Sequence, residues 1–261
     1  MVKFSKANAK IDALKQVDEL AEFLAGKRKV YSFDLLSGYS CPFAEQCLSK
    51  ATIVDGGKRK IKDGPKTEFR CFSASQEVQY TNVYNSRKAN FDALRGMHLN
   101  DMIATINLAL PANAGIVRIH VAGDFFNPDY AFAWWNVAVL NPNVLFYFYT
   151  KSLQYWLDID HQYGMPENLI MTASRGGRQD HMIDGRRLRE AVVVYSEQQA
   201  ADLGLEIDHD DSHAARPSMR HQDFALLVHG TQPKGSEAAD ALKLLKKNKV
   251  RHSYSRKVAS A

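Results

Sequence analysis

The sequence predicts an α/β fold, an open partial barrel of six strand–helix units. Short apolar runs alternate with helical patterns from Val30 to Lys247. This alternation is typical of parallel sheets, whose right-handed crossovers place the helices outside the sheet. The runs lack a polar face, which indicates strands buried on both sides. Six units are too few for a closed eight-stranded barrel, and a doubly wound sheet is the alternative.

The expected elements follow one another regularly along the chain. Apolar residues at helical spacing predict an N-terminal helix over 9–25, which Gly26 ends. Further helical patterns run from Ser73 to about Gly96 and from His98 to Leu110. Strands are expected over 30–36, 116–121, 144–149, 169–172, 191–195 and 224–228, with helices over 128–140, 152–161, 196–204 and 236–247.

A single domain is expected over 1–261, with an N-terminal helical extension (1–29), the partial barrel (30–245) and a basic tail (246–261). The chain has 45% hydrophobic residues, enough for a sizeable core, and no apolar run of membrane-spanning length. With no signal-peptide pattern, we expect a soluble protein of the cytoplasm.

The net charge of +5 and the pI near 9.0 permit an acidic partner. The basic residues gather at both ends of the chain and at 58–62. Such a run is more often a solvated surface than a nucleic-acid site when no binding motif accompanies it, so nucleic acid is a weakly supported partner.

All three cysteines lie between the first expected strand and the helical segment that begins near Ser73. The spacing is C-x5-C, then twenty-three residues and the third cysteine: Cys41, Cys47 and Cys71. Three thiols cannot all pair into disulfides, and nothing indicates secretion. We therefore favour a reduced, intracellular set of metal ligands.

Three thiolates suit two kinds of metal site. Structural zinc needs a fourth ligand, and no histidine lies between Met1 and Met97 to complete a Cys3His set. A 4Fe-4S cluster on three cysteines keeps one iron open to an outside ligand. Simple burial of the thiols is the other alternative, although Gly38 and Pro42 beside them indicate turns rather than core.

A small hairpin is expected inside the cysteine loop. Asp55-Gly56-Gly57 separates two short apolar runs, at 51–54 and 60–61, and this tripeptide is a turn signal. The hairpin would fold the excursion back on itself. That return is required if the third cysteine is to share one cluster with the other two.

Polar residues gather where the expected strands end, and in parallel barrels these ends build the active site. Gly123 would let a ligand approach the backbone, and Asp124 would accept hydrogen bonds from an amine unless it serves as a turn or N-cap. Lys151 and Arg175 would hold a carboxylate or phosphate unless they form salt bridges. The full set at this edge is the three cysteines, Gly123-Asp124, Thr150-Lys151-Ser152, Ser174-Arg175, Ser196-Glu197 and His229 to Thr231.

Two histidines and three acids alternate over 208–213, a composition that suits a hard or borderline cation. A solvated turn is the favoured interpretation, because no second carboxylate motif accompanies it. His120, within an expected strand, is interpreted as a core histidine.

A cysteine loop after the first strand and a small-Gly-acid turn after the second resemble the radical SAM superfamily. In that superfamily three cysteines hold a 4Fe-4S cluster, and its open iron binds the amine and carboxylate of S-adenosylmethionine. The resemblance implies that Ala122-Gly123-Asp124 contacts the amino group, and that Thr172 and Ser174 meet a ribose. It implies these cluster ligands: Cys41, Cys47 and Cys71. The chain departs from the superfamily's C-x3-C-x2-C spacing, because its third cysteine lies beyond the hairpin.

Six segments carry a closer likeness: 63–67, 70–75, 123–126, 149–152, 208–214 and 229–236. Through them most of the chain, residues 30–245, resembles the phage-encoded gene product 88 family. The resemblance implies bacteriophage origin and a place in the host cytoplasm.

Three functional hypotheses follow. The first is an iron-sulfur protein with a radical-SAM-like barrel, an enzyme if it cleaves S-adenosylmethionine reductively. The second is a non-catalytic iron-sulfur redox or sensor protein. The third is a zinc-stabilised nucleic-acid-binding protein, suggested by the positive charge.

Overall fold

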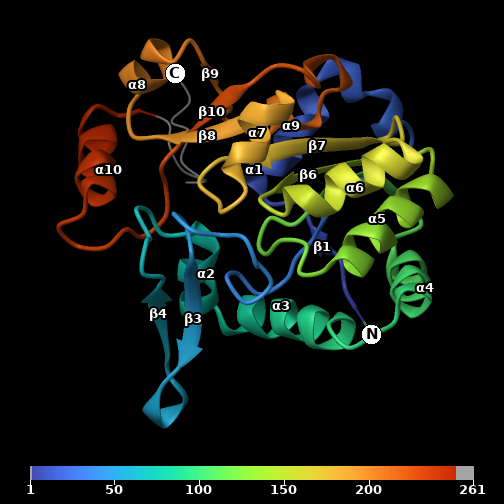
Figure 1. Cartoon of the computed structure of the whole chain (residues 1–261), viewed down its shortest axis with the longest axis horizontal. Coiled ribbons are helices and arrows are strands. Elements are labelled where there is room, and N and C mark those ends of the chain that lie inside the picture. Colours follow the sequence, from blue (N-terminus) through green and yellow to red (C-terminus); the bar gives the residue numbers. More distant parts are fainter. Residues whose placement is uncertain (1, 251–261) are drawn as a thin grey trace.

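A mixed, mostly parallel sheet of eight strands runs through the protein, in a computed structural model that describes residues 2–250 (Figure 1). The strands are β1 (Ser5–Lys6), β2 (Lys29–Phe33), β5 (Ala114–Ile119), β6 (Leu145–Thr150), β7 (Leu169–Ser174), β8 (Glu190–Val194), β9 (Glu206–Ile207) and β10 (Phe224–Leu227). Their spatial order is β1-β2-β5-β6-β7-β8-β10-β9.

Six of these strands are the ones that the sequence predicts, and they lie side by side in chain order. Each neighbouring pair from β2 through β5, β6, β7 and β8 to β10 is parallel. A doubly wound sheet would reverse its order part-way, and this order does not. Two short strands that sequence reasoning missed complete the edges: β1 pairs antiparallel with β2, and β9 pairs parallel with β10.

Helices occupy the connections between the strands, as alternation predicts. The α-helices are α1 (Ala9–Asp12), α2 (Phe72–Gln79), α3 (Thr81–Leu94), α4 (Leu99–Ala109), α5 (Pro128–Leu140), α6 (Leu153–Tyr163), α7 (Asp180–Arg186), α8 (Glu197–Asp202), α9 (Ser212–Ala215) and α10 (Glu237–Lys247). Short 3-10 turns lie at Ala13–Gln16, Asp18–Leu20, Glu22–Leu24, Asp55–Gly57 and Pro217–Met219. The last part of the basic tail, 251–261, lies outside the described residues.

The expected continuous helix over 9–25 is wrong. Only α1 is α-helical, and three 3-10 turns follow it. Val17 interrupts the segment with extended backbone (φ −93°, ψ 109°). Ile11, Leu14 and Leu20 are nevertheless fully buried. Their spacing therefore reflects the packing of short turns on the sheet rather than one amphipathic helix.

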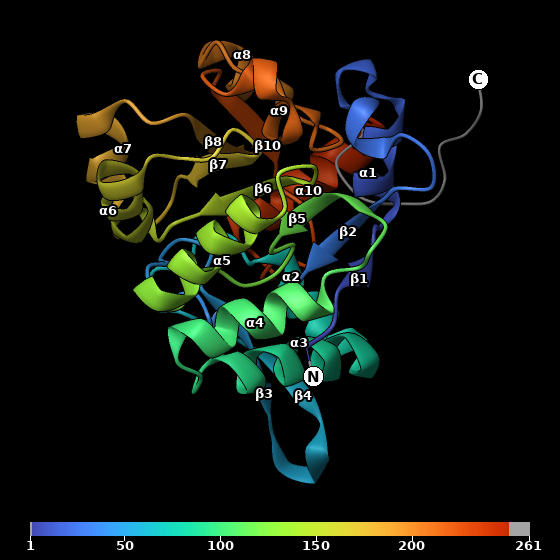
Figure 2. The same ribbon diagram turned by 90° about the vertical axis from the view of Figure 1, so that its right-hand side faces the viewer.

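Both faces of the sheet are covered. Figure 2 shows α4 and α5 on one side and α1 on the other. On the first side Trp134 of α5 and Trp156 of α6 share a buried cluster with Phe146 of β6. On the second side Ile11 and the helix α9 pack with Tyr147, also of β6. Adjacent residues of one strand thus face opposite layers, which explains the near-continuous apolar runs.

The hairpin predicted inside the cysteine loop is confirmed. It consists of β3 (Ser49–Ile53) and β4 (Arg59–Asp63), an antiparallel pair apart from the main sheet. Gly56 and Gly57 at its tip both have positive φ, which explains why the turn uses glycines. Within residues 2–250, none of the helices combines the length and hydrophobicity that crossing a membrane requires.

Candidate cysteine site at the strand ends

The segment from residue 37 to residue 71, here called the cysteine loop, lies against the ends of the parallel strands. The amide of Gln46 donates to the Gly176 carbonyl at 3.0 Å, just after β7. The amide of Arg178 donates back to the Phe43 carbonyl at 2.9 Å. These backbone bonds hold the region between Cys41 and Cys47 beside the end of β7.

The chain returns to the same place after the hairpin. Arg70 forms a bidentate ion pair with Asp63 at the end of β4, with the closest N–O contact at 2.7 Å. The Arg70 amide donates to Gln232 Oε1 at 2.7 Å, and Gln232 Nε2 donates to the Arg70 carbonyl at 3.2 Å. These contacts fix Cys71 between the hairpin and the loop after β10. A site shared by all three cysteines would require such a return of the chain.

The three thiols lie close enough to one another to influence each other's ionisation. All three cysteines are free, and each is half-buried as a residue. Burial is the main cause that raises the pKa of each thiol, well above 9.0 for Cys41 and to about 11 for Cys71. Negative charge on Cys47 further raises the pKa of both others. The Lys151 ammonium acts in the opposite direction on Cys47.

Hydrogen-bond donors face this group of sulfurs. The Gly38 amide donates to Cys41 Sγ at 3.3 Å. The backbone and the hydroxyl of Ser73 lower the pKa of the Cys71 thiol by hydrogen bonding. Cys71 is also the N-cap of α2, where the helix dipole favours negative charge. These hydrogen-bond donors and the helix dipole favour the thiolate form of the cysteines. Among residues 2–250, however, no three His, Cys, Asp or Glu side chains are placed to hold one metal ion.

The raised pKa values predict a pH dependence for thiol reactivity. Because only the thiolate reacts, alkylation of the metal-free protein by iodoacetamide should still be accelerating between pH 9 and 11, the range over which Cys71 is shifted. The measurement is the alkylation rate against pH, read by mass spectrometry for each cysteine. The control is the same chain in urea, where the alkylation rate should level off near the ordinary pKa of a thiol. A plateau below pH 9 in the folded protein would show that the thiols are not desolvated as described.

Asp124 bridges the ends of β5 and β6. Its Oδ1 accepts from the Phe125 amide at 2.8 Å and from Thr150 Oγ1 at 2.7 Å, and its Oδ2 accepts from the Lys151 amide at 2.9 Å. Burial raises the pKa of this carboxyl, while the three donors oppose the rise. The carboxylate also lies close enough to Cys41 and Cys47 to raise their pKa values. A carboxylate has about four acceptor positions, and these three donors occupy three of them.

Lys151 is buried and joins β6 to β7. Its ammonium donates to the Ser174 carbonyl at 2.7 Å, to Ser174 Oγ at 2.9 Å and to the Arg175 carbonyl at 2.6 Å. These bonds use all three of its donors. The predicted contact with a ligand carboxylate or phosphate would therefore require an exchange of partners.

Gly123 is needed for close packing beneath the cysteine loop. It has φ +93°, and a Cβ atom there would lie 2.6 Å from Ser40 Oγ and 2.8 Å from Leu35 Cβ. The turn at Gly123 is therefore in close contact with Ser40 of the cysteine loop.

Gly123→Ala tests this contact. We expect a lower free energy of unfolding in urea denaturation, because the variant combines left-handed backbone with overpacking that typically costs about 1–3 kcal/mol. Gly204→Ala is the matched control, since Gly204 has φ +68° but a Cβ atom added there would have no neighbour within 4 Å. Equal losses in the two variants would argue against tight packing at Gly123.

Three more of the predicted residues have partners within the protein. Arg175 pairs with Glu190 and, at 2.7 Å, with Asp184. Thr172 is buried and accepts a hydrogen bond from Arg189, while Ser174 binds Lys151. Their proposed contacts with a ligand therefore stay predictions.

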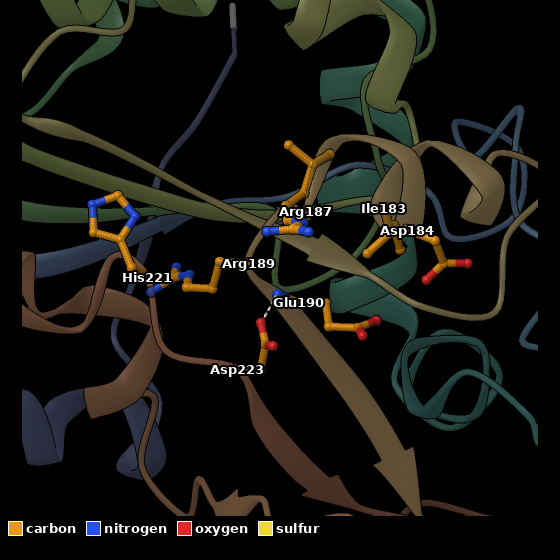
Figure 3. Close-up of a pocket in the computed structure, with 8 residues that line it drawn as sticks. Ile183, Asp184, Arg187, Arg189, Glu190, His221 and Asp223 are labelled. Atoms are coloured by element: carbon orange, nitrogen blue, oxygen red, sulfur yellow. Dashed lines mark hydrogen bonds between the residues drawn. The ribbon is translucent and has the colours of Figure 1, made fainter.

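A pocket of about 280 Å³ lies beyond Arg175, at the start of β8 (Figure 3). Two of its lining carboxylates, Asp184 and Glu190, are the ion-pair partners of Arg175. Asp223 accepts a hydrogen bond from the Glu190 amide at 2.8 Å, the dashed line in Figure 3. The pocket carries both signs of charge and does not include the cysteines.

The 208–213 segment is not a solvated turn, because Asp208 and Asp211 are buried. Asp211 is fully buried and forms ion pairs with Lys10, at 2.7 Å, and with Arg118. Tyr147 donates a hydrogen bond to the same carboxylate at 3.0 Å. Sequence reasoning missed this network, although Arg118 is a charged residue in an otherwise apolar strand and so gave a signal.

A comparison with models of protein families shows to which family the chain belongs. The family model described as Gene product 88 matches residues 2–249. The chain belongs to the Gene product 88 family. Neither a curated protein nor a solved structure matches the chain.

Five of the six segments that carry the Gene product 88 likeness, all but 208–214, meet in space around the cysteine site. Asp63 and Arg70 belong to two of them and form an ion pair, and Gln232 of a third binds the Arg70 backbone. Asp124 and Thr150, from two others, share a hydrogen bond. Most of the segments that carry the family likeness therefore lie around the loop that holds the thiols.

Proposed function

We propose that this Gene product 88 protein binds a 4Fe-4S cluster at the cysteine site. The ligands would be Cys41, Cys47 and Cys71. The observation that carries the proposal is that three free thiols, from positions up to thirty residues apart, lie near enough at the ends of the parallel strands to shift one another's pKa. Backbone hydrogen bonds and the Arg70–Asp63 pair hold both parts of the loop there.

The surroundings of the thiols support an anionic cluster. Lys151 brings positive charge toward Cys47, and the amino end of α2 does the same at Cys71. The Gly38 amide donates to a sulfur, and such bonds tune cluster potential. Because the ligands must lose protons, loading should release protons and improve with rising pH.

We also infer that the sheet belongs to a partial (β/α)6 barrel of radical-SAM-like form. Barrel strands are staggered and follow chain order. Consistent with this, only Ala173 and Ser174 at the end of β7 pair with β8, at its first two residues, Glu190 and Ala191. The order of the six parallel strands is the chain order. The cysteine loop follows the first of these strands, where that superfamily holds its cluster.

We further propose that the open iron binds a small molecule with an amine and a carboxylate, such as S-adenosylmethionine. Three cysteines leave one iron of a cube without a protein ligand. Asp124 would hold the amine through its remaining acceptor position. Once reduced, such a cluster would supply an electron to the ligand on its open iron. We expect the protein to act in a host cytoplasm, as the likeness to a phage-encoded family implies.

Titration of the reduced, reconstituted protein with S-adenosylmethionine tests the enzymatic form of the proposal. Methionine and 5'-deoxyadenosine should appear, together with a change in the cluster spectrum. A cluster that forms but leaves the additive intact and its own spectrum unchanged would support the redox or sensor alternative. Zinc without iron or sulfide would support the zinc alternative and contradict the cluster.

A further inference from the structure

The hairpin β3–β4 presents lysines along one face. Its register pairs Lys50 with Lys62 and Thr52 with Lys60. Because side chains alternate across a strand, these four residues share a face, opposite to the face that includes Ala51. Lys60 and Lys62 are exposed, whereas Ala51 is buried.

This lysine face is electrostatically unbalanced. Lys50 and Lys62 lie directly opposite each other, and like charges in that position destabilise a hairpin. The ion pairs among the described residues include neither these two lysines nor Lys58 and Lys60. Lys50 instead lies over the ring of Tyr39 at 4.8 Å. The face thus accumulates positive charge that an anionic partner would neutralise.

The opposite face anchors the hairpin to the protein. Arg59 Nε donates to the Glu77 carbonyl at 2.8 Å, and its Nη2 donates to Thr81 Oγ1 at 2.7 Å. The same guanidinium lies over the ring of Tyr84 at 4.9 Å. Both strands also contact α2. Anchoring of this kind keeps the lysine face turned toward solvent.

The hairpin projects from the rest of the molecule in both views (Figures 1 and 2). Each strand has five residues, a length of about 17 Å. A two-stranded ribbon of this size fits the major groove of B-form DNA, about 12 Å wide and 8.5 Å deep. The major groove of A-form RNA is too narrow for it.

We infer that the lysine face of β3–β4 binds the phosphates of double-stranded DNA, with the ribbon lying in the major groove. The contacts are to the backbone, so binding is independent of sequence and falls steeply with salt. This inference goes beyond cluster binding and does not depend on it, because the lysines and the cysteines are different residues of the loop.

The test is fluorescence anisotropy of the full chain with a short labelled DNA duplex over a series of salt concentrations. The variant K50Q/K60Q/K62Q should bind about tenfold more weakly or worse, with the slope of log affinity against log salt reduced by about 0.9 for each lysine lost. K50R/K60R/K62R should keep the wild-type affinity, which separates charge from folding.

A matched control removes equal charge elsewhere. K243Q/K246Q/K247Q, on α10, should stay within about twofold of the wild type. Equal weakening by the two triple glutamine variants would overturn the inference, as would an undetectable wild-type affinity at low salt or tighter binding to duplex RNA. An unchanged iron content in K50Q/K60Q/K62Q keeps this result distinct from the cluster proposal.

Discussion

Cys71→Ala is expected to lose the iron-sulfur cluster, with iron and acid-labile sulfide falling to background and the visible absorbance disappearing. The reason is that removal of one of three thiolates leaves two irons of the cube without a protein ligand. The position is informative because Cys71 lies beyond the hairpin, and it reaches the other two only through the fold. The measurement is metal and sulfide analysis after anaerobic purification, with circular dichroism to confirm folding.

Ser75→Ala is the matched control for this variant. Ser75 lies in the same helix, α2, and its hydroxyl is buried without a hydrogen-bond partner among the described residues. Its replacement removes one polar atom from the same neighbourhood and should leave the cluster intact. A full complement of iron and sulfide in Cys71→Ala would contradict the assignment of this cysteine as a ligand.

Asp211→Asn is expected to lower the free energy of unfolding by about 3–5 kcal/mol, because it leaves two cations with no carboxylate at a buried site. Lys10 and Arg118 both pair with Asp211, whose side chain is fully buried. Asn suits the left-handed backbone of this residue (φ 66°), so the variant isolates the charge from the conformation. Urea denaturation at neutral pH measures the effect.

The contribution of Asp211 should also depend on pH. Arg118 and Lys10 lower the pKa of Asp211 from 3.8 to about 2, against the effect of burial. A lowered pKa in the folded state stabilises the protein above the ordinary value, and this stabilisation is lost as pH falls from about 3.8 toward 2. The free energies of unfolding of the wild type and of Asp211→Asn should therefore converge in acid. Asp240→Asn, which disrupts an exposed pair with Lys243, should cost less than about 1 kcal/mol.

Much of the fold follows from local pattern. The six parallel strands were predictable because their apolar runs, such as 144–149, are bounded by turns and alternate with helical patterns. The hairpin was predictable because Asp55-Gly56-Gly57 is a turn signal between short runs. These features depend on residues near one another in the chain, which a single sequence displays.

The errors concern contacts between distant segments. The spacing of Ile11, Leu14 and Leu20 suits a helix, yet packing on the sheet divides the segment into short turns. Residue type also gave no indication of the partners that Lys151 has within the protein, which are carbonyl and hydroxyl groups at the end of β7 and just after it. The same applies to Asp211, whose cations come from positions far away in sequence. Such partners are set by tertiary structure and leave no local pattern.

The most direct test of the central claim is the iron, acid-labile sulfide and zinc content of anaerobically purified protein, with an EPR spectrum after dithionite reduction and again after S-adenosylmethionine is added. Cluster binding predicts iron and sulfide in equal amounts, in the stoichiometry of one 4Fe-4S cluster per chain, and an EPR signal that the additive perturbs. Zinc in place of iron and sulfide would contradict the account of the three cysteines.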